Sequence, residues 1–137
     1  MSPAASNKPD AGQLSVPPGW PRTDHPLRIA LFGWARLSFQ GSQGSGYNLS
    51  ASELAAGLAM SGHTVLYLCS GRKYNLWPWM YIAPTETWRG VVCYDLYNSP
   101  NISPASYNFQ NMRDETSHRR QTRVVLNWLD AHRVEVV

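Results

Sequence analysis

Two short runs of apolar residues, at positions 27–33 (LRIALFG) and 64–70 (TVLYLCS), stand out from the more polar sequence around them. Neither run alternates apolar with polar positions, which is typical of strands buried on both faces of a parallel sheet. The residues between them, 49–61, repeat apolar side chains at helical spacing. The apolar positions of that repeat are Ala51, Leu54, Ala55, Leu58 and Ala59. The pattern predicts two parallel strands joined by a helix through a right-handed crossover.

The ends of this helix carry their own signals. Ser50 and Glu53, in the sequence SASE, fit a capping box in which the Ser50 side chain caps the first turn. A start one turn earlier, at Asn48, is the alternative. Gly62 follows the last apolar position, and we expect it to end the helix in the left-handed conformation.

The second half of the chain is less regular. Residues 71–88 are aromatic and contain Pro78 and Pro84, which predicts a loop or a short strand at most. Residues 89–98 (RGVVCYDLYN) read as a strand, and the polar stretch after them as a loop. Residues 113–132 lack Pro and Gly, so we expect a helix.

That last helix has an apolar side made by Val124, Leu126, Trp128 and Leu129. The final VEVV then predicts the start of another buried strand. Strands that alternate with helices indicate an α/β fold, specifically a doubly wound parallel sheet of the Rossmann-like type. A sequence of 137 residues fits one such domain.

The amino-terminal residues 1–26 are rich in Pro, Ser, Ala and Gly and have no apolar period. We interpret them as a flexible tail, with Trp20 docking on the body of the domain, which spans residues 27–137. The net charge of +3 is too small to indicate nucleic acid as a partner. Two cysteines, no signal-peptide pattern and no long apolar run favour a cytoplasmic protein with free thiols.

Glycines at 41, 44 and 46 lie between the first strand and the helix. Backbone amides at a helix N-terminus attract anions, and glycine lets a ligand approach the backbone. A phosphate-binding P-loop is excluded because Gly-Lys-Ser/Thr is missing. A dinucleotide site is disfavoured because Leu49 stands where a third glycine is needed and Cys69 near the expected acid. A loop that merely turns is the alternative.

Other candidate chemistry is sparse. We find no spacing that suggests a metal site and no nucleophile elbow. His63 reads as a packing and hydrogen-bonding residue. A basic stretch on the last helix is either a solvated face or a contact with anionic lipid or a phosphorylated acceptor. Its members are Arg113, Arg119, Arg120 and Arg123. Asn98 and Asn101 follow a strand, where ligands of open α/β sheets bind.

The segments LRIALFG and GSGYNLSASELAAGLAMSGHTVLYLCSG together resemble the N-terminal domain of family 4 glycosyltransferases of the GT-B fold. That family opens with a strand, a Gly-Gly loop, a helix that ends in "L…GH.V" and a second strand. Gly44-Ser45-Gly46 stands at the Gly-Gly place, and Gly62-His63-Thr64-Val65 at the helix end. The closing LDAHRVEVV is similar to a later helix and strand of the family, so the resemblance covers nearly all of residues 27–137.

The resemblance implies sugar transfer from a nucleotide-sugar donor to a glycan or lipid-linked acceptor, with no cofactor and no metal. By this resemblance and by position, the candidate substrate-binding residues are Gly44, Ser45, Gly46, Tyr47, Asn98 and Asn101. The catalytic residues stay unassigned. The expected location is the cytoplasm, with peripheral contact at the inner membrane face left open.

The chain departs from the family in two ways. It has Gly-Ser-Gly-Tyr where members often have Gly-Gly followed by an acid, which leaves the substrate preference open. It also lacks the second Rossmann-like half that usually holds the nucleotide-sugar, so we expect an acceptor-side domain, cut short at its C-terminal end and inactive without a companion half. A non-catalytic Rossmann-like module that binds a ligand or a partner is the alternative.

Overall fold

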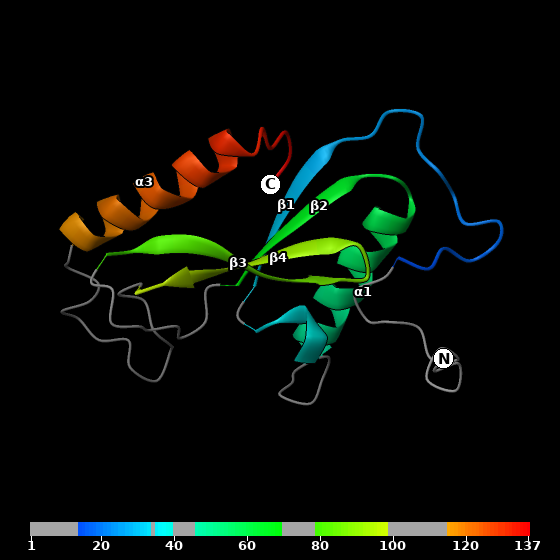
Figure 1. Cartoon of the computed structure of the whole chain (residues 1–137), viewed down its shortest axis with the longest axis horizontal. Helices are drawn as coiled ribbons and strands as arrows, with labels where there is room; N and C mark the ends of the chain where they lie inside the picture. The colour runs from blue at the N-terminus through cyan, green and yellow to red at the C-terminus, as the bar shows by residue number, and fades with distance from the viewer. Residues whose placement is uncertain (1–13, 34, 40–45, 70–78, 99–114) are drawn as a thin grey trace, which may run out of the picture.

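The computed structural model describes residues 14–33, 35–39, 46–69, 79–98 and 115–137 (Figure 1). Its elements, in chain order, are β1 (Arg28–Gly33), the 3-10 turn η2 (Leu37–Phe39), α1 (Gly46–Met60), β2 (Thr64–Cys69), β3 (Tyr81–Trp88), β4 (Val91–Tyr97) and α3 (Glu115–Ala131). The four strands form one sheet in the order β1-β2-β4-β3. The chain is therefore an α/β domain, as the sequence predicted.

Three of the four strands run parallel. β1 pairs with β2 and β2 with β4 in parallel, so the predicted strand–helix–strand unit is confirmed. The sheet is nevertheless mixed, because β3 pairs with β4 antiparallel. The prediction of a fully parallel sheet is therefore wrong for β3.

The second side of β1 is paired only near its start, by the last residues of the chain. Ile29 and Val136 form an isolated parallel bridge. The Ala30 N–H donates to the Val136 carbonyl at 2.9 Å, and the Glu135 N–H donates to the Arg28 carbonyl at 2.8 Å. The predicted final strand therefore amounts to a single bridge, and β1 lies between β2 and this bridge.

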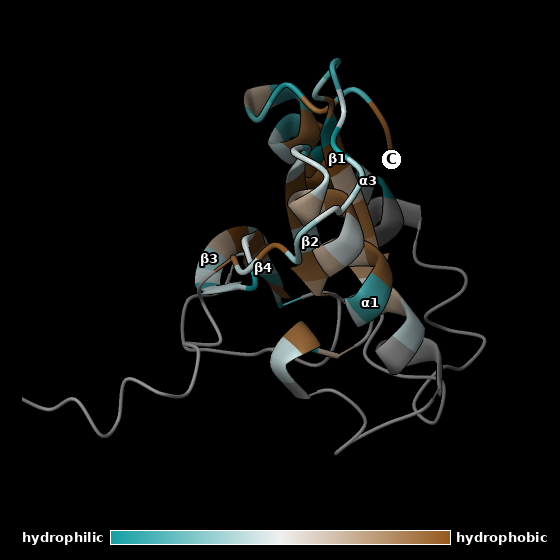
Figure 2. Cartoon of the chain, turned by 90° about the vertical axis from the view of Figure 1, so that its right-hand side faces the viewer, coloured by the Kyte–Doolittle hydropathy of each residue, from teal (hydrophilic) through white to brown (hydrophobic). Residues whose placement is uncertain are grey.

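Two helices cover opposite faces of the sheet, with α3 above it and α1 below it in Figure 1. One cluster of buried side chains joins α1 to the sheet through Ala55, Ala59, Val65 and Tyr67. The other joins α3 to the opposite face and is built on Leu66, Leu68, Tyr94, Leu96 and Trp128. The strands between them are largely hydrophobic in Figure 2. This burial on both faces explains why β1 and β2 read as unbroken apolar runs.

The helix α1 begins at Gly46, a turn before the predicted cap. Ser50 lies inside the helix and is exposed, so the predicted capping box is wrong. The buried face consists of small residues, Ser52, Ala55, Ala56 and Ala59, which let the helix approach the sheet closely. Leu54, predicted to face the core, is 54% exposed because this narrower face is the one turned to the sheet.

The ends of both helices use left-handed residues. Gly62 has φ 104°, as predicted, and its N–H donates to the Ala59 carbonyl while the His63 N–H donates to that of Leu58. Arg133 takes the same position after α3 with φ 53°. In α3, Trp128 is buried as predicted, but Leu126 is 57% exposed because Val125 packs on the sheet in its place.

The strand β3 was predicted as a loop or a short strand, and it has eight residues. Pro84 lies within it, next to an irregularity in the pairing between Pro84 and Glu86. Proline is tolerated there because β3 is the last strand of the sheet, and an edge strand has one side without ladder hydrogen bonds. The aromatic composition and Pro84 are typical of a loop, so the sequence pattern did not indicate this edge strand.

Residues before β1 lie against the C-terminal half of α1. The Trp20 indole N–H lies 3.1 Å from the Ser61 hydroxyl oxygen and 3.3 Å from the Gly57 carbonyl, so the expected docking of Trp20 is confirmed. His63 accepts a hydrogen bond at Nδ1 from the Leu27 N–H at 3.0 Å, in keeping with a structural role. Within the described ranges, none of the helices is long and apolar enough to cross a membrane.

Burial of Cys93 links the stability of the fold to alkaline pH. The side chain is 2% exposed, and its burial raises the pKa of the thiol from an ordinary 9.0 to about 12. In the unfolded chain the thiol ionises near pH 9, while in the folded chain it stays protonated. The unfolded state then binds fewer protons, so stability falls as the pH rises from about 9 towards 12.

We expect the free energy of unfolding to fall by up to about 1.4 kcal/mol per pH unit above pH 9 from this thiol alone. Urea titrations at pH 8, 9, 10 and 11 measure the slope, and Cys93→Ala should reduce it. Burial also raises the pKa of Tyr94 and Tyr97, so part of the slope should persist in the variant. An identical slope in both proteins would contradict the assignment to Cys93.

Candidate functional site

The residues predicted to bind substrate fall into two groups. Gly44, Ser45 and Asn101 lie outside the described residues, so their role stays a prediction. Gly46 and Tyr47 are the first two residues of α1. The predicted glycine-rich segment follows η2 in the chain, and its last glycine, Gly46, begins the helix.

Asn98 lies just after β4 and has φ 62°. Its side-chain amide donates a hydrogen bond to the Trp79 carbonyl at 2.8 Å. This bond ties the end of β4 to the residues just before β3. Asn98 thus has a local structural contact, and ligand binding by its side chain stays a prediction.

The chain leaves β1 in a tightly constrained path. A Cβ atom on Gly33 would lie 1.9 Å from the hydroxyl oxygen of Tyr67, so only glycine fits there. The Tyr67 hydroxyl donates to the Ala35 carbonyl at 2.7 Å and fixes the residues that follow β1. Ser52 of α1 donates to the Leu37 carbonyl at 3.4 Å, which holds η2 against the helix.

This path brings Arg36 to a buried acid on β4. An Arg36 Nη2–Asp95 Oδ2 ion pair of 2.9 Å joins the two side chains, of which Asp95 is fully buried and Arg36 is 33% exposed. The hydrogen bond to Asp95 is the main reason why the pKa of Arg36 is raised, so the guanidinium is always charged. Two more atoms, Asp95 Oδ1 and Arg36 Nε, are buried and have no hydrogen-bond partner within the described part of the chain.

Aromatic and polar side chains surround the Arg36–Asp95 pair. Tyr81 and Tyr97 stack with their ring centroids 4.8 Å apart, at the paired ends of β3 and β4. Burial, and next the charge of Asp95, raise the pKa of Tyr97. The Ser38 hydroxyl donates to Glu86 Oε1 at 2.8 Å and links η2 to β3.

The arrangement holds a partly exposed cation on the segment between β1 and α1. One third of the Arg36 side chain is exposed to solvent, and Asp95 fixes the orientation of its guanidinium from inside the sheet. A fixed guanidinium and free backbone amides both bind phosphate or carboxylate oxygens. The site therefore suits an anionic group, while Asp95 itself is too buried to reach a ligand.

Sequence reasoning missed both members of this pair. The available signal was the acid in VVCYDLY, since a lone Asp in a strand that is otherwise apolar needs a buried partner. Arg36 gave no such signal, because the loop that carries it has no periodic pattern. Across the residues with described positions, no group of three or more His, Cys, Asp and Glu side chains is arranged to hold a metal ion.

Comparisons with protein-family models, with curated proteins and with solved structures find no match for this chain.

Proposed function

We propose that this chain is a Rossmann-like domain whose ligand binds at the carboxyl end of β1. The observation that carries the proposal is the position of β1 between two parallel neighbours, β2 on one side and the Val136 bridge on the other. The chain reaches β2 through α1 and reaches Val136 through α3, on opposite faces of the sheet. Ligands of open α/β sheets bind at such a switch point.

The chemistry at this end of β1 favours an anionic ligand. Gly46 begins α1, so the first backbone amides of the helix and the positive end of the helix dipole lie there. Arg36, held by Asp95, adds a fixed cation from the segment between β1 and α1. Phosphate groups of a nucleotide-sugar match both features.

The resemblance to family 4 glycosyltransferases narrows the proposal to sugar transfer. Under it, the chain is the N-terminal, acceptor-side domain, and Gly44, Ser45, Gly46 and Tyr47 face the donor phosphates. The acceptor is a glycan or a lipid-linked sugar, and Asn98 and Asn101 contribute to its site. In enzymes of this type the donor is held mainly by a second domain, so transfer requires such a companion half.

Binding of nucleotide-sugars to this chain tests the proposal. In a titration of the ¹⁵N-labelled protein with UDP-glucose and GDP-mannose, we expect the amide signals of Gly44, Ser45 and Gly46 to shift. Binding should be weak, with a dissociation constant on the order of 1 mM, because half of the site belongs to another domain. Inorganic phosphate should shift the same amides less.

Two glycines of α1 give a matched pair of variants. Gly46→Val should remove the shifts, because a branched side chain at the helix N-terminus blocks the approach to the backbone. Gly57→Ala, near the other end of the same helix, should leave them unchanged. Absence of any shift with all nucleotides would refute the proposed site and favour the non-catalytic alternative, a module for another ligand or partner.

A further inference from the structure

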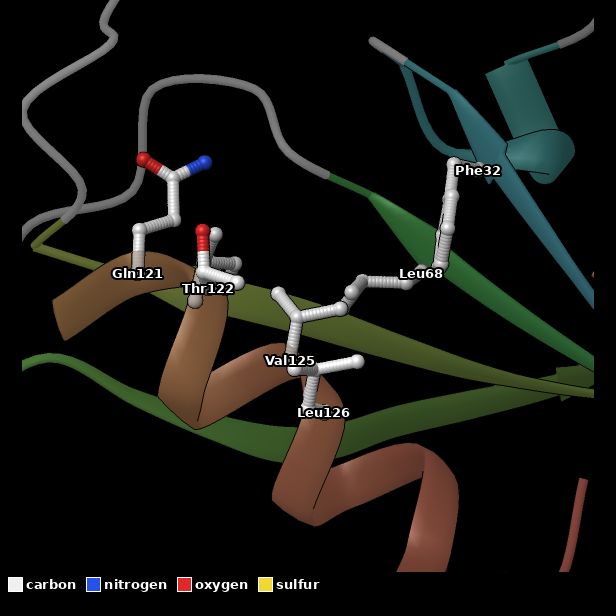
Figure 3. A pocket seen from close by; sticks show the side chains of 7 residues that line it. Phe32, Leu68, Gln121, Thr122, Val125 and Leu126 are labelled. Atoms are coloured by element: carbon white, nitrogen blue, oxygen red, sulfur yellow. The ribbon is translucent and has the colours of Figure 1, made fainter. Parts of the chain in front are cut away.

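A pocket of about 320 Å³ lies between α3 and the sheet, on the face opposite α1 (Figure 3). Val125 and Leu126 of α3 line one side of the pocket, and Phe32 of β1 and Leu68 of β2 line the other. Leu96 of β4, Gln121 and Thr122 complete the lining. Its volume is at the lower end of the roughly 300–1,000 Å³ typical of small-molecule sites, so it suits a slender group.

The lining is apolar except for one end. Leu126 is 57% exposed and Phe32 is 40% exposed, so a ligand from solvent can reach both side chains. Gln121 and Thr122 supply the polar atoms, toward the N-terminal half of α3. A hydrocarbon chain would bury Phe32 and Leu126 and gain the free energy of removing apolar surface from water.

A cationic depression adjoins the pocket. It is lined by Arg119, Thr122, Arg123, Leu126 and Asn127, so the two hollows share Thr122 and Leu126. Arg119 and Arg123 are exposed, and no acidic residue is among the described residues that line either hollow. Within the described ranges Arg123 has no ion-pair partner. The pocket therefore suits an apolar chain, and the adjoining depression suits an anionic head group.

We propose that these two hollows form one site for an anionic amphiphile, a single hydrocarbon chain that carries a phosphate or carboxylate head. The chain lies in the pocket between Phe32, Leu68 and Val125. The head lies on Arg119 and Arg123, one helical turn apart on α3. The site is on the α3 face, so it is separate from the nucleotide-sugar proposal; if both hold, the amphiphile is the acceptor.

Calorimetric titration with dodecyl phosphate, below its micelle concentration, tests the proposal. We expect binding with a dissociation constant on the order of 100 μM, which suits a ligand of this size. Inorganic phosphate, dodecanol and dodecyltrimethylammonium should each bind at least about tenfold more weakly, because each lacks one of the two features. Equal binding of inorganic phosphate or of the cationic amphiphile would overturn the proposal.

Variants on the exposed side of α3 separate this site from a general effect of charge. Arg123→Glu and Leu126→Asp should each weaken dodecyl phosphate binding by about tenfold or more without changing the thermal melt. Arg120→Glu is the matched control: it is exposed on the same helix and lines neither hollow. It should leave the affinity within about twofold. An equal loss in Arg120→Glu would refute a localised site.

The amphiphile can come from solution or from a bilayer, and vesicles distinguish these sources. If the ligand arrives from solution, the protein should bind monomeric dodecyl phosphate but sediment only weakly with phosphatidylglycerol vesicles. Strong sedimentation that Leu126→Asp and Arg123→Glu abolish, together with monomer binding, assigns the bilayer as the source. Vesicle binding with no binding of the monomer would mean surface adsorption and would overturn the pocket.

Discussion

Arg36→Ala is expected to lower the free energy of unfolding by about 3–5 kcal/mol. The change leaves the Asp95 carboxylate fully buried, with its Oδ2 partner removed and its Oδ1 already unpaired in the described part of the chain. Removing one partner of a buried pair is far more costly than removing both, because the remaining charge is uncompensated. Urea unfolding followed by circular dichroism measures the difference.

The double variant Arg36→Met with Asp95→Leu is the control for this prediction. Replacing both members by apolar residues of similar size should bring stability to within about 1 kcal/mol of the natural chain. If Arg36→Ala cost less than about 1 kcal/mol, water would have to reach Asp95, and the pair would not stabilise the fold. Nucleotide-sugars should no longer shift the amide signals in the double variant, since Arg36 is part of the proposed anion site.

Gly33→Ala is expected to destabilise the domain by about 3 kcal/mol. The new Cβ would lie 1.9 Å from the Tyr67 hydroxyl oxygen and 2.8 Å from the ring carbon that bears it. Tyr67 is 1% exposed and cannot move aside without displacing its packed neighbours. Overpacking of this kind costs about 1–3 kcal/mol, and the hydrogen bond from Tyr67 to Ala35 adds about 1 kcal/mol if it breaks.

Gly57→Ala gives the opposite expectation under the same measurement. A Cβ there would meet only a ring carbon of Trp20, at the ordinary distance of 3.5 Å. Alanine in a helix interior is favoured over glycine by about 0.5–1 kcal/mol, so this variant should be more stable. Similar losses from Gly33→Ala and Gly57→Ala would show that the contact with Tyr67 relaxes easily.

The elements that the sequence predicted well are those whose signals are local. The apolar runs of β1 and β2 and the Gly62 cap depend on residues near in sequence, and all three are confirmed. The buried face of α1 was predicted less well. Leu54 matched the helical period, but the sheet accepts only the narrower face of Ala55 and Ala59.

Features that depend on distant partners could not be read from the pattern. Pro84 argued against a strand, and only the position of β3 at the sheet edge makes it tolerable. Arg36 pairs with Asp95, which lies 59 positions away in the chain, so the sequence near Arg36 does not indicate the contact. The candidate site is therefore known from sequence only as a glycine-rich segment, and its fixed cation came from the structure.

The bridge between β1 and the last residues also determines when the sheet is completed during folding. The hydrogen bond from Arg28 to Glu135 spans 107 positions, whereas the Leu27–His63 bond beside the first crossover spans 36. Contacts of larger separation require more loop-closure entropy before they add stability, so they tend to form late. The unit β1–α1–β2 can therefore form first, and the start of β1 gains its second neighbour only when residues 135 and 136 have reached it.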